Sequence, residues 1–475
     1  MPPNPAPTIV WFRRDLRLGD NPALTAAVAT GRPVIPVYIH QAETDGPWAE
    51  GGASRWWLHH SLKALDQSLG APLHLLHGLA ETVLPRLARE VEADAVLWNR
   101  RTEPWAERQD AACAAALAGL GVATRSFDAA LLFKPDTIVS QSGQPFKVFT
   151  PFWKACLAAP PPPPPLPPPI ALRPWSGAIA GDDLESWRLT PHTPDWADGL
   201  RRSWRPGEAS AQARSSEFLG RNLPFYAVGR NRPGQDGTSR LSPHLHFGEI
   251  SPRQLFHAAR AAGEPGEGRD RFLAELGWRE FSAQLLRQFP DLPQRPLRPE
   301  FERLVWRDDP DGVAAWRHGG TGYPIVDAGM RQLWATGWMH NRIRMVTASF
   351  LVKDLLVSWR VGEAWFRDTL VDADLASNAA SWQWVAGCGA DASPFFRVFN
   401  PVLQGEKFDA DGAYVREWCP ELAGLPDRWL HQPWRAPAQV LRQAGVTLGK
   451  TYPLPLVDHD QARKRALAAF AGLKA

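Results

Sequence analysis

The chain has 475 residues, of which 44% are hydrophobic and 22% charged, with a formal net charge of +3. These values are typical of a soluble globular protein with two or three folding units. The longest near-continuous apolar run, residues 111–123, is mostly Ala and Gly and is shorter than the roughly 18 residues expected of a membrane span. We therefore expect this run to form a core helix.

Targeting and cysteine patterns place the protein in a reducing compartment. The first residues lack a basic region followed by a long apolar segment, so a secretory signal is not expected. The four cysteines are scattered, without disulfide-scaffold density or metal-ligand spacing: Cys113, Cys156, Cys388 and Cys419. We expect a cytoplasmic protein with no metal site.

The first 130 residues alternate short apolar runs with segments of helical periodicity. Such alternation, with strands buried on both faces, indicates a parallel sheet covered by helices. No G-x-G-x-x-G follows the first run, so the usual dinucleotide fingerprint is missing. We predict a Rossmann-like α/β domain over 1–130, whose five strands lie at 8–12, 33–39, 72–78, 95–100 and 122–127.

A proline-rich run at 158–175 interrupts this pattern and is typical of a stiff spacer. We place a linker at 131–200 and a large all-α domain at 201–475. Two Ser-Pro pairs in that domain, at 242–243 and 251–252, are typical helix starts, and Gln254 stands at a capping-box position. Residues 201–475 hold 36 Lys and Arg against 30 Asp and Glu, whereas 1–200 hold 17 against 20. The basic excess suits a polyanion partner, or is a solvated surface.

Tryptophan is used far more than tyrosine, with 23 Trp against 5 Tyr. Both side chains combine an apolar body with a polar tip, so an ordinary core has no reason for this preference. The stretch "SNAASWQW" at 377–384 places two Trp residues one position apart. A function specific to indole is therefore indicated.

Three segments of the helical domain carry candidate ligand chemistry. "GTSRLSP" at 237–243 combines hydroxyl groups, an Arg and helix-start N–H groups, which suit either a phosphate cradle or simple capping. Residues 336–359 are predicted to form one long helix with Arg and Asn beside Trp and Met on one face, a pattern typical of a ligand-lined face or of a satisfied core Arg. "DADLASN" at 372–378 adds acids that suit an Arg partner, a heterocycle or a helix cap.

A fourth segment, "AELGWREF" at 274–281, places Glu275 and Trp278 on one helix face. A carboxylate beside a flat aromatic ring suits a nucleobase, through edge hydrogen bonding and stacking. The alternative is an exposed Glu beside a core Trp.

Four blocks of the sequence together resemble the DNA photolyase and cryptochrome family. They are "WFRRDLRLGDNPAL", "GTSRLSPHLHFGEISPRQL", "TGYPIVDAGMRQLWATGWMHNRIRMVTASFLVKDLL" and "SNAASWQWVAGCGADASPFFRVFNP", which occur in the family's order. The resemblance implies FAD bound in the helical domain. Matching positions near its phosphates are Tyr226, Thr238, Ser239, Arg240, Leu241 and Ser242, and those near its ring are Arg344, Asp372, Asp374 and Asn378.

The resemblance also implies roles for the tryptophans. Trp382, Trp359 and Trp306 match the family's electron-transfer chain, in which an indole gives an electron to the excited flavin. Residues that match the lesion-facing positions of cyclobutane pyrimidine dimer photolyases are Glu275, Trp278, Asn341, Met345 and Trp384. Photolyases of the (6-4) type would have a His at the position of Asn341, and plant cryptochromes tend to replace most of these residues. The block at 238–251 is nonetheless similar to the bacterial branch nearest plant cryptochromes.

The implied function is light-driven repair of cyclobutane pyrimidine dimers, by electron transfer from excited reduced FAD to a dimer flipped out of DNA. Glu275 would hydrogen-bond the base edge and stabilise the developing charge. A cryptochrome-type photoreceptor without repair activity is the alternative, and a non-catalytic nucleic-acid-binding protein rich in Trp is another. DNA phosphate contacts are expected from Arg230, Arg342, Gln404 and Lys407, on single- or double-stranded DNA and by a monomer.

The N-terminal domain resembles the family's antenna domain, which holds a second chromophore. The segment 99–110 departs from the best-known folate-binding pattern, since it retains a Glu, either Glu103 or Glu107, without the expected neighbouring Asn. Methenyltetrahydrofolate is the first choice as antenna, and a deazaflavin, FMN or no chromophore are the alternatives.

Overall fold

The computed structural model describes residues 5–41, 48–263, 265–392, 394–395 and 397–473. Ser393 and Phe396, which belong to one of the blocks quoted above, lie outside the described residues. The chain forms two compact units, each assembled from separate segments. The first comprises Met1–Arg221, Ser239–Pro265 and Leu273–Pro290, and the second comprises Asn222–Thr238, Gly266–Phe272 and Asp291–Ala475. The division at residues 130 and 200 stays a prediction.

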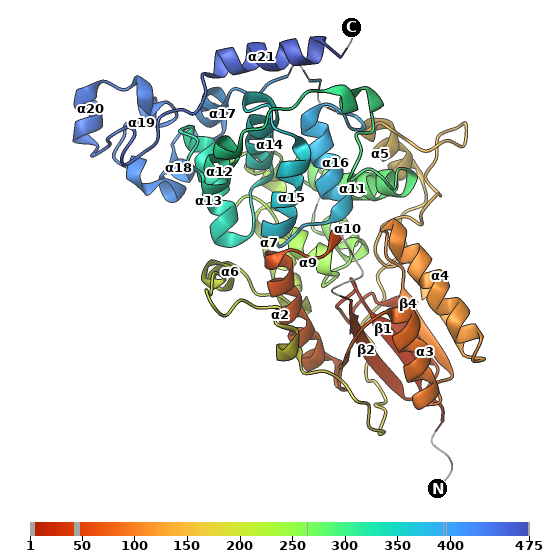
Figure 1. Cartoon of the computed structure of the whole chain (residues 1–475). Helices are drawn as coiled ribbons and strands as arrows, with labels where there is room; N and C mark the ends of the chain where they lie inside the picture. Colours follow the sequence, from red (N-terminus) through yellow and green to blue (C-terminus); the bar gives the residue numbers. More distant parts are fainter. Residues whose placement is uncertain (1–4, 42–47, 264, 393, 396, 474–475) are drawn as a thin grey trace. The chain divides into compact units, whose positions relative to one another are not determined.

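A five-stranded parallel sheet forms the centre of the first unit, as the alternating pattern predicts (Figure 1). Its strand order is β3-β2-β1-β4-β5. The chain first adds β2 and β3 on one side of β1, and then returns to add β4 and β5 on the other side, so the order of the strands reverses between β1 and β4. Register pairs Thr8 of β1 with Val34 of β2 and with Ala95 of β4. The strands are β1 (Thr8–Phe12), β2 (Val34–His40), β3 (His74–His77), β4 (Ala95–Asn99) and β5 (Ala123–Phe127).

Continuous apolar runs form the central strands because both faces are covered. Every residue of β1 is buried, and so are six of the seven residues of β2, whereas β5 at the sheet edge is largely half-buried or exposed. One core cluster joins Trp11 and Val37 of the sheet to Leu84 of α3 and Leu117 of α4. The helices of this part are α1 (Pro22–Ala29), α2 (Gly52–Leu69), α3 (Ala80–Glu90) and α4 (Pro104–Ala118). Of the apolar run at 111–123, which was expected to form a core helix, only residues 111–118 are helical, and of these only Cys113 and Leu117 are buried.

The rest of the first unit consists of helices joined by long irregular segments. Ser251 caps α10 through a complete capping box with Gln254, as the sequence predicts. The neighbouring α9 begins at Ser242 itself and has no side-chain cap. The helices are α5 (Phe149–Ala158), α6 (Asp198–Ser203), α7 (Glu208–Arg221), α9 (Ser242–Phe247) and α10 (Pro252–Ala261), together with the C-terminal part of α11 (Glu267–Gln288).

The second unit is helical and is built around one large hydrophobic cluster. The cluster includes the fully buried side chains of Trp316, Trp359 and Trp382. Its helices are α8 (Tyr226–Gly229), α12 (Pro310–His318), α13 (Pro324–Thr336), α14 (Asn341–Ser349), α15 (Trp359–Thr369), α16 (Leu375–Ala386), α17 (Pro401–Phe408), α18 (Ala413–Trp418), α19 (Asp427–Leu430), α20 (Ala438–Gln443) and α21 (His459–Ala471). This matches the expected all-α class.

The single long helix predicted over 336–359 is wrong. Gly337 adopts φ 67° and ends α13, and His340 caps the start of α14 by accepting a hydrogen bond from the Arg342 N–H. The chain then makes a π-helical turn over Phe350–Asp354 and reaches Leu356 at φ 56° before α15 begins. Trp338 therefore lies buried in a connection, outside the face to which the periodicity assigned it. Among the described residues, no helix is both long and apolar enough to span a membrane.

Candidate functional site

Two acidic residues stand at the start of α16. The Asp374 side chain caps this helix by accepting a hydrogen bond from the Ser377 N–H at 2.8 Å. The backbone N–H of Asp374 donates to the Asp372 carbonyl at 2.7 Å. The resulting turn leaves the Asp372 carboxylate buried beside the helix start, where a cation is its natural partner.

That partner is Arg344 of α14. Its Nη2 donates to both carboxylate oxygens of Asp372, at 3.1 and 2.8 Å, and its Nε donates to the Met339 carbonyl at 2.8 Å. The Arg344 side chain stays 25% exposed whereas that of Asp372 is 3% exposed. Because Nε is bonded to Met339 and Nη2 to Asp372, two different nitrogens fix the plane of the Arg344 guanidinium.

Asn378 lies one turn after Asp374 on α16 and is buried. Its Nδ2 donates to the Glu363 carboxylate at 2.9 Å and to the Glu363 backbone carbonyl at 3.2 Å. Burial raises the pKa of Glu363, against the opposing effects of Arg367 and of the Asn378 hydrogen bond. Because both amide hydrogens point to Glu363, the Oδ1 of Asn378 is oriented to accept a hydrogen bond from a ligand N–H.

The three tryptophans that match an electron-transfer chain share one environment. Trp382 and Trp359 are each 2% exposed within the cluster of the second unit, and Trp306 packs against the same cluster while remaining half-buried. The Trp382 ring meets Phe366 edge to face at 4.9 Å. A Cβ on Gly362 of α15 would collide with the Trp382 ring, so only Gly lets the helix approach this indole.

The loop at 237–242 crosses from one unit to the other. Tyr226 and Thr238 belong to the second unit, where Gly237 lies so close to Gly229 that a Cβ would be 2.8 Å from its carbonyl oxygen. In the first unit, the Ser239 carbonyl accepts a hydrogen bond from Arg214 at 2.9 Å. Arg240 adopts φ 52° and its guanidinium lies over the Trp204 ring at 5.3 Å, whereas Leu241 is buried and Ser242 exposed.

Glu275 and Trp278 lie half-buried on α11, in the part that belongs to the first unit. The Trp278 indole stacks on Phe149, with ring centroids 3.8 Å apart and planes inclined by 7°. Phe149 thus covers one face of Trp278 and fixes its plane, so a stacked base would lie on the other face. The sequence offered no signal for this contact, because the two rings are far apart along the chain.

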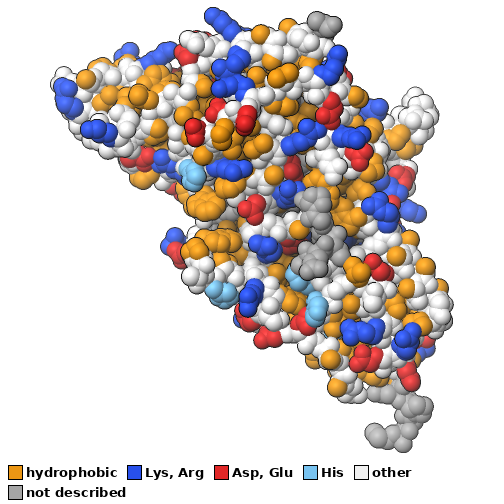
Figure 2. Space-filling model, viewed as in Figure 1, with side chains coloured by type: hydrophobic (Ala, Val, Ile, Leu, Met, Phe, Trp, Pro, Cys, Tyr) orange, Lys and Arg blue, Asp and Glu red, His pale blue; other side chains and the backbone are white. Residues whose placement is uncertain are grey.

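The remaining residues that the resemblance assigns to the lesion or to the DNA belong to the second unit. Asn341 and Met345 stand four positions apart on α14, on either side of Arg344. Lys and Arg side chains are spread among acidic and apolar groups over the face drawn in Figure 2. The other four are half-buried: Trp384 on α16, Gln404 on α17, Arg342 on α14 and Arg230 at the end of α8.

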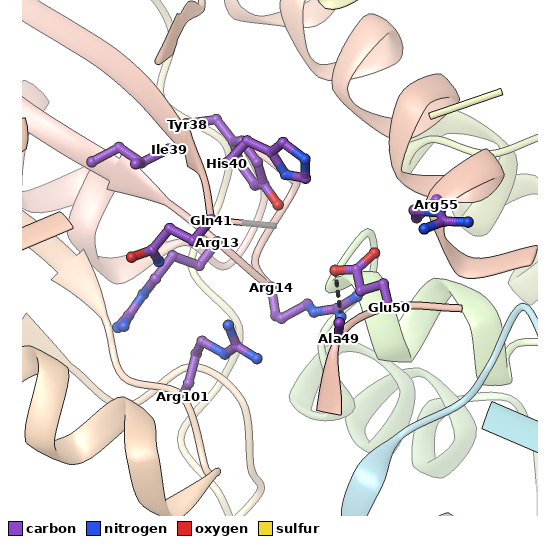
Figure 3. Close-up of a pocket in the computed structure, with 10 residues that line it drawn as sticks. All are labelled: Arg13, Arg14, Tyr38, Ile39, His40, Gln41, Ala49, Glu50, Arg55 and Arg101. Atoms are coloured by element: carbon purple, nitrogen blue, oxygen red, sulfur yellow. Dashed lines mark hydrogen bonds and ion pairs between the residues drawn. The ribbon is translucent and has the colours of Figure 1, made fainter. Parts of the chain in front are cut away.

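A small pocket lies at the carboxyl ends of β1, β2 and β4, where the direction of winding reverses and ligands of open α/β sheets commonly bind. Arg14 extends to Glu50 with a 2.7 Å ion pair, and Arg101 lies below it in the view of Figure 3. Burial would raise the pKa of Glu103, but its ion pair with Arg101 and the nearby Arg14 lower it to about 2. The pocket has a volume of about 70 Å³. Small-molecule sites usually have roughly 300–1,000 Å³, so this pocket is too small for a chromophore.

A larger cavity of about 400 Å³ lies between α4, the segment after β5 and α11. Glu107 lines it and pairs with Arg287. Glu280 also lines it, and its Oε2 accepts hydrogen bonds from the N–H groups of Leu132 at 2.9 Å and Phe133 at 3.4 Å. Burial raises the pKa of Glu280 to about 7 despite Arg279 and these backbone donors.

The second carboxyl oxygen of Glu280 is buried and, within the described part of the chain, has no hydrogen-bond partner. Arg279 Nη1 is 3.7 Å away, which is beyond hydrogen-bond distance. A buried polar atom of this kind commonly marks the place of a missing polar group. The cavity therefore suits a heterocycle that carries N–H donors.

Comparison with known proteins agrees with this architecture. Residues 8–169 match the family model described as DNA photolyase, and residues 272–472 match that described as the FAD binding domain of DNA photolyase. The chain is 52% identical to the deoxyribodipyrimidine photo-lyase of Agrobacterium fabrum, over 99% of this chain and 98% of that protein. The chain belongs to the DNA photolyase and cryptochrome family.

Two further likenesses refine this assignment. A crystal structure of a bacterial class III photolyase from Agrobacterium tumefaciens superposes with a TM-score of 0.96 at 52% identity, and covers 99% of this chain and 98% of that one. Cryptochrome-1 of Arabidopsis thaliana is 41% identical over 98% of this chain and 70% of its own length. The protein is thus an enzyme of the deoxyribodipyrimidine photo-lyase type and a flavoprotein with an FAD-binding domain.

The side chains of the second unit fit a flavin. Arg344 and Asp372 form a fixed polar pair, and the oriented Oδ1 of Asn378 is an acceptor for a ring N–H. Glu363, which fixes that orientation, was not among the predicted residues. The only indication of Glu363 in the sequence was its position as a single acid between Gly362 and Phe366, on the buried side of α15.

Proposed function

We propose that the protein repairs cyclobutane pyrimidine dimers in DNA, single- or double-stranded, by light-driven electron transfer that uses FAD. FAD, when bound and reduced, supplies a photoexcitable one-electron donor. The observation that carries the proposal is the layout of α14, where Arg344, which we assign to the flavin, stands in sequence between Asn341 and Met345, which we assign to the dimer. One turn of α14 thereby carries residues for both the flavin and the dimer, which favours a short electron-transfer path between the two.

Each remaining group has a role that its surroundings support. Asn378, held by Glu363, would accept a hydrogen bond at the flavin ring. Trp382 and Trp359 are shielded from water, and Trp306 is half-buried, as a path from the buried flavin toward solvent requires. Trp278, stacked on Phe149, would support one face of a flipped base while Glu275 binds its edge.

The proposal is tested with the reduced holoprotein and an oligonucleotide that carries one thymine dimer. Illumination should restore the undamaged strand, as measured by chromatography, whereas a dark control should leave the dimer intact. An unchanged dimer count in a protein with a flavin spectrum would instead favour a photoreceptor. A purified protein without flavin absorption would exclude both.

We further propose methenyltetrahydrofolate as the antenna, in the 400 Å³ cavity. The size of the cavity, the buried oxygen of Glu280 and the Arg287–Glu107 pair support it. A pterin edge offers N–H donors to Glu280. Absorption and mass spectrometry of the ligand released from the holoprotein distinguish this folate from a deazaflavin, from FMN and from the absence of an antenna.

A further inference from the structure

Trp334 is the most exposed tryptophan in the described part of the chain, with 63% of its surface open to solvent. It stands near the end of α13, next to Leu333, which is 1% exposed and belongs to the large cluster of the second unit. Trp334 itself lies outside that cluster. Its indole is therefore displayed on the surface, where a large rigid ring suits contact with a ligand.

A second tryptophan fixes the plane of this exposed ring. Trp365 of α15 stacks on Trp334, with ring centroids 5.9 Å apart and planes inclined by 6°. Trp365 is half-buried and packs against the hydrophobic cluster, so the core holds it in place. One side of the Trp334 ring is thereby supported, and its other side is available to a flat partner.

A cation lies beside this pair of rings. The guanidinium carbon of Arg317, on α12, lies 4.8 Å from the centroid of the Trp365 ring. Within the described residues, Arg317 forms no ion pair, and its buried Nε has no hydrogen-bond partner. Arg331 of α13 differs, because it is paired with Glu421 at 2.8 Å. The charge of Arg317 is thus not balanced by a carboxylate of the described chain, and an anion is its natural ligand.

Three helices of the second unit, α12, α13 and α15, bring these side chains together (Figure 1). We call the group formed by Trp334, Trp365 and Arg317 the aromatic platform. None of the three was among the residues that the resemblance assigns to the flavin, the lesion or the DNA. The platform therefore has no role in the repair reaction proposed above.

The chemistry of the platform favours a nucleotide over a protein. Trp334 is the only exposed large hydrophobic residue on α12, α13 and α15, all of which are described. A stable protein partner usually buries about 1,200–2,000 Å², for which one exposed ring is a poor centre. Single-stranded nucleic acids instead stack individual bases on aromatic side chains and pair their phosphates with basic groups. Duplex DNA does not fit, because its bases present only their edges in the grooves.

We propose that the aromatic platform is a second nucleic-acid site, which holds an unpaired nucleotide of single-stranded DNA. A base stacks on the open side of Trp334, and a phosphate of the same strand pairs with Arg317. Trp365 acts as a positioning residue that keeps the Trp334 ring in plane. The site requires neither a pyrimidine dimer nor light.

Quenching of 2-aminopurine fluorescence by a stacked indole tests this inference. The probe is a short oligothymidylate with one 2-aminopurine, added to the holoprotein in the dark, with and without a saturating unlabelled duplex that carries a thymine dimer. Saturable quenching is expected under both conditions, because the duplex occupies the lesion site only. Trp334→Ala should weaken this binding about fivefold to a hundredfold, the usual range for one stacked base, and Trp334→Phe should retain part of it.

The contribution of Arg317 is measured by salt dependence. Arg317→Gln should weaken binding of the probe and lower the slope against salt by about 0.7, the share of one phosphate contact on a single strand. Trp196→Ala is the matched control for the ring, since Trp196 is 42% exposed and belongs to the first unit. Arg202→Gln is the control for the charge, since Arg202 is exposed and paired with Asp198. Both controls should bind the probe as the wild type does.

The outcomes separate the platform from the repair function. FAD absorption and dimer repair should be unchanged in Trp334→Ala, which also shows that this variant is folded. Equal quenching in Trp334→Ala and wild type, or no quenching in the wild type, would overturn the platform and leave repair standing. Self-association of the wild type that is lost in Trp334→Ala, without quenching, would overturn it in favour of a second copy of the chain. Trp334-dependent quenching in a protein that repairs no dimers would support the platform and overturn repair.

Discussion

The side-chain nitrogen of Asn378 is bonded twice to Glu363, at 2.9 Å to its carboxylate and at 3.2 Å to its backbone carbonyl. The two bonds together set which end of the amide faces the predicted flavin ring. They decide the orientation because amide oxygen and nitrogen are similar in size.

Replacing Glu363 should therefore disturb the flavin site through its effect on Asn378. Glu363→Ala removes the carboxylate acceptor of the buried Asn378 N–H and leaves only the longer bond to the backbone carbonyl, so we expect the free energy of unfolding to fall by about 2 kcal/mol. FAD content per protein, measured by absorption, should fall as well. Glu363→Gln retains a carbonyl acceptor and should keep most of the FAD. Equal FAD content in Glu363→Ala and wild type would contradict this account.

Gly362→Ala should destabilise the second unit. The added methyl group meets the Trp382 ring, and overpacking of this kind costs about 1–3 kcal/mol. Gly220 of α7 is a matched control, since a Cβ there meets no atom within 4 Å, and Gly220→Ala should leave stability equal or slightly higher. Chemical denaturation of both variants gives the comparison. A stable Gly362→Ala protein with unaltered photoreduction would show that the indole can move aside.

Glu280 should make stability depend on pH. Burial raises its pKa from 4.5 to about 7, so the folded protein keeps the proton through a range in which the unfolded chain has lost it. This contribution is present below pH 4.5 and is lost as the pH rises through 7. Glu280→Gln keeps a neutral acceptor for the backbone donors and should raise the free energy of unfolding at pH 8 by up to about 3 kcal/mol.

Urea unfolding of the ligand-free protein at several pH values from 5 to 8 would measure this effect. Glu267→Gln changes an exposed acid of the same helix and should have the pH profile of the wild type. If Glu280→Gln and wild type show parallel profiles, Glu280 is not the titrating group. Loss of the antenna in Glu280→Gln would independently support its contact with the ligand.

Trp306→Phe should slow photoreduction of oxidised FAD by at least tenfold, because Phe is a much poorer one-electron donor than indole. Repair by protein that is already reduced should continue, since the dimer receives its electron from the flavin. Trp196→Phe is the control, because Trp196 is an exposed tryptophan of the other unit. Transient absorption would follow the rate. Unchanged photoreduction would mean that electrons reach the flavin through other tryptophans.

Sequence patterns predicted those helices and strands that are determined by residues close together in the chain. The five strands follow from apolar runs buried on both faces, and the start of α10 follows from Ser251 and Gln254. The break within 336–359 was missed because apolar periodicity continues through it, although Gly337 could have been read as a helix end. The π-helical turn over Phe350–Asp354 has no such signal.

Contacts across the fold explain what the sequence could not reveal. Glu363 meets Asn378 only because α15 and α16 pack together, and Glu280 lines a cavity only because α11 lies beside the segment after β5. Neither residue stands in a recognisable spacing. The residues predicted by resemblance are those expected to contact the ligands, whereas groups such as Glu363 that hold them carry no motif.

The absence of a side chain at Gly362 has a consequence for sequence variation. The Trp382 ring fills the space that any larger residue at 362 would need, so the two positions cannot change independently. Homologues with a bulkier residue at 362 should carry a smaller ring, or none, at 382, and would then lack the first indole of the chain. Coupled variation at these two positions would separate photoreducible members from those that obtain reduced flavin by other means.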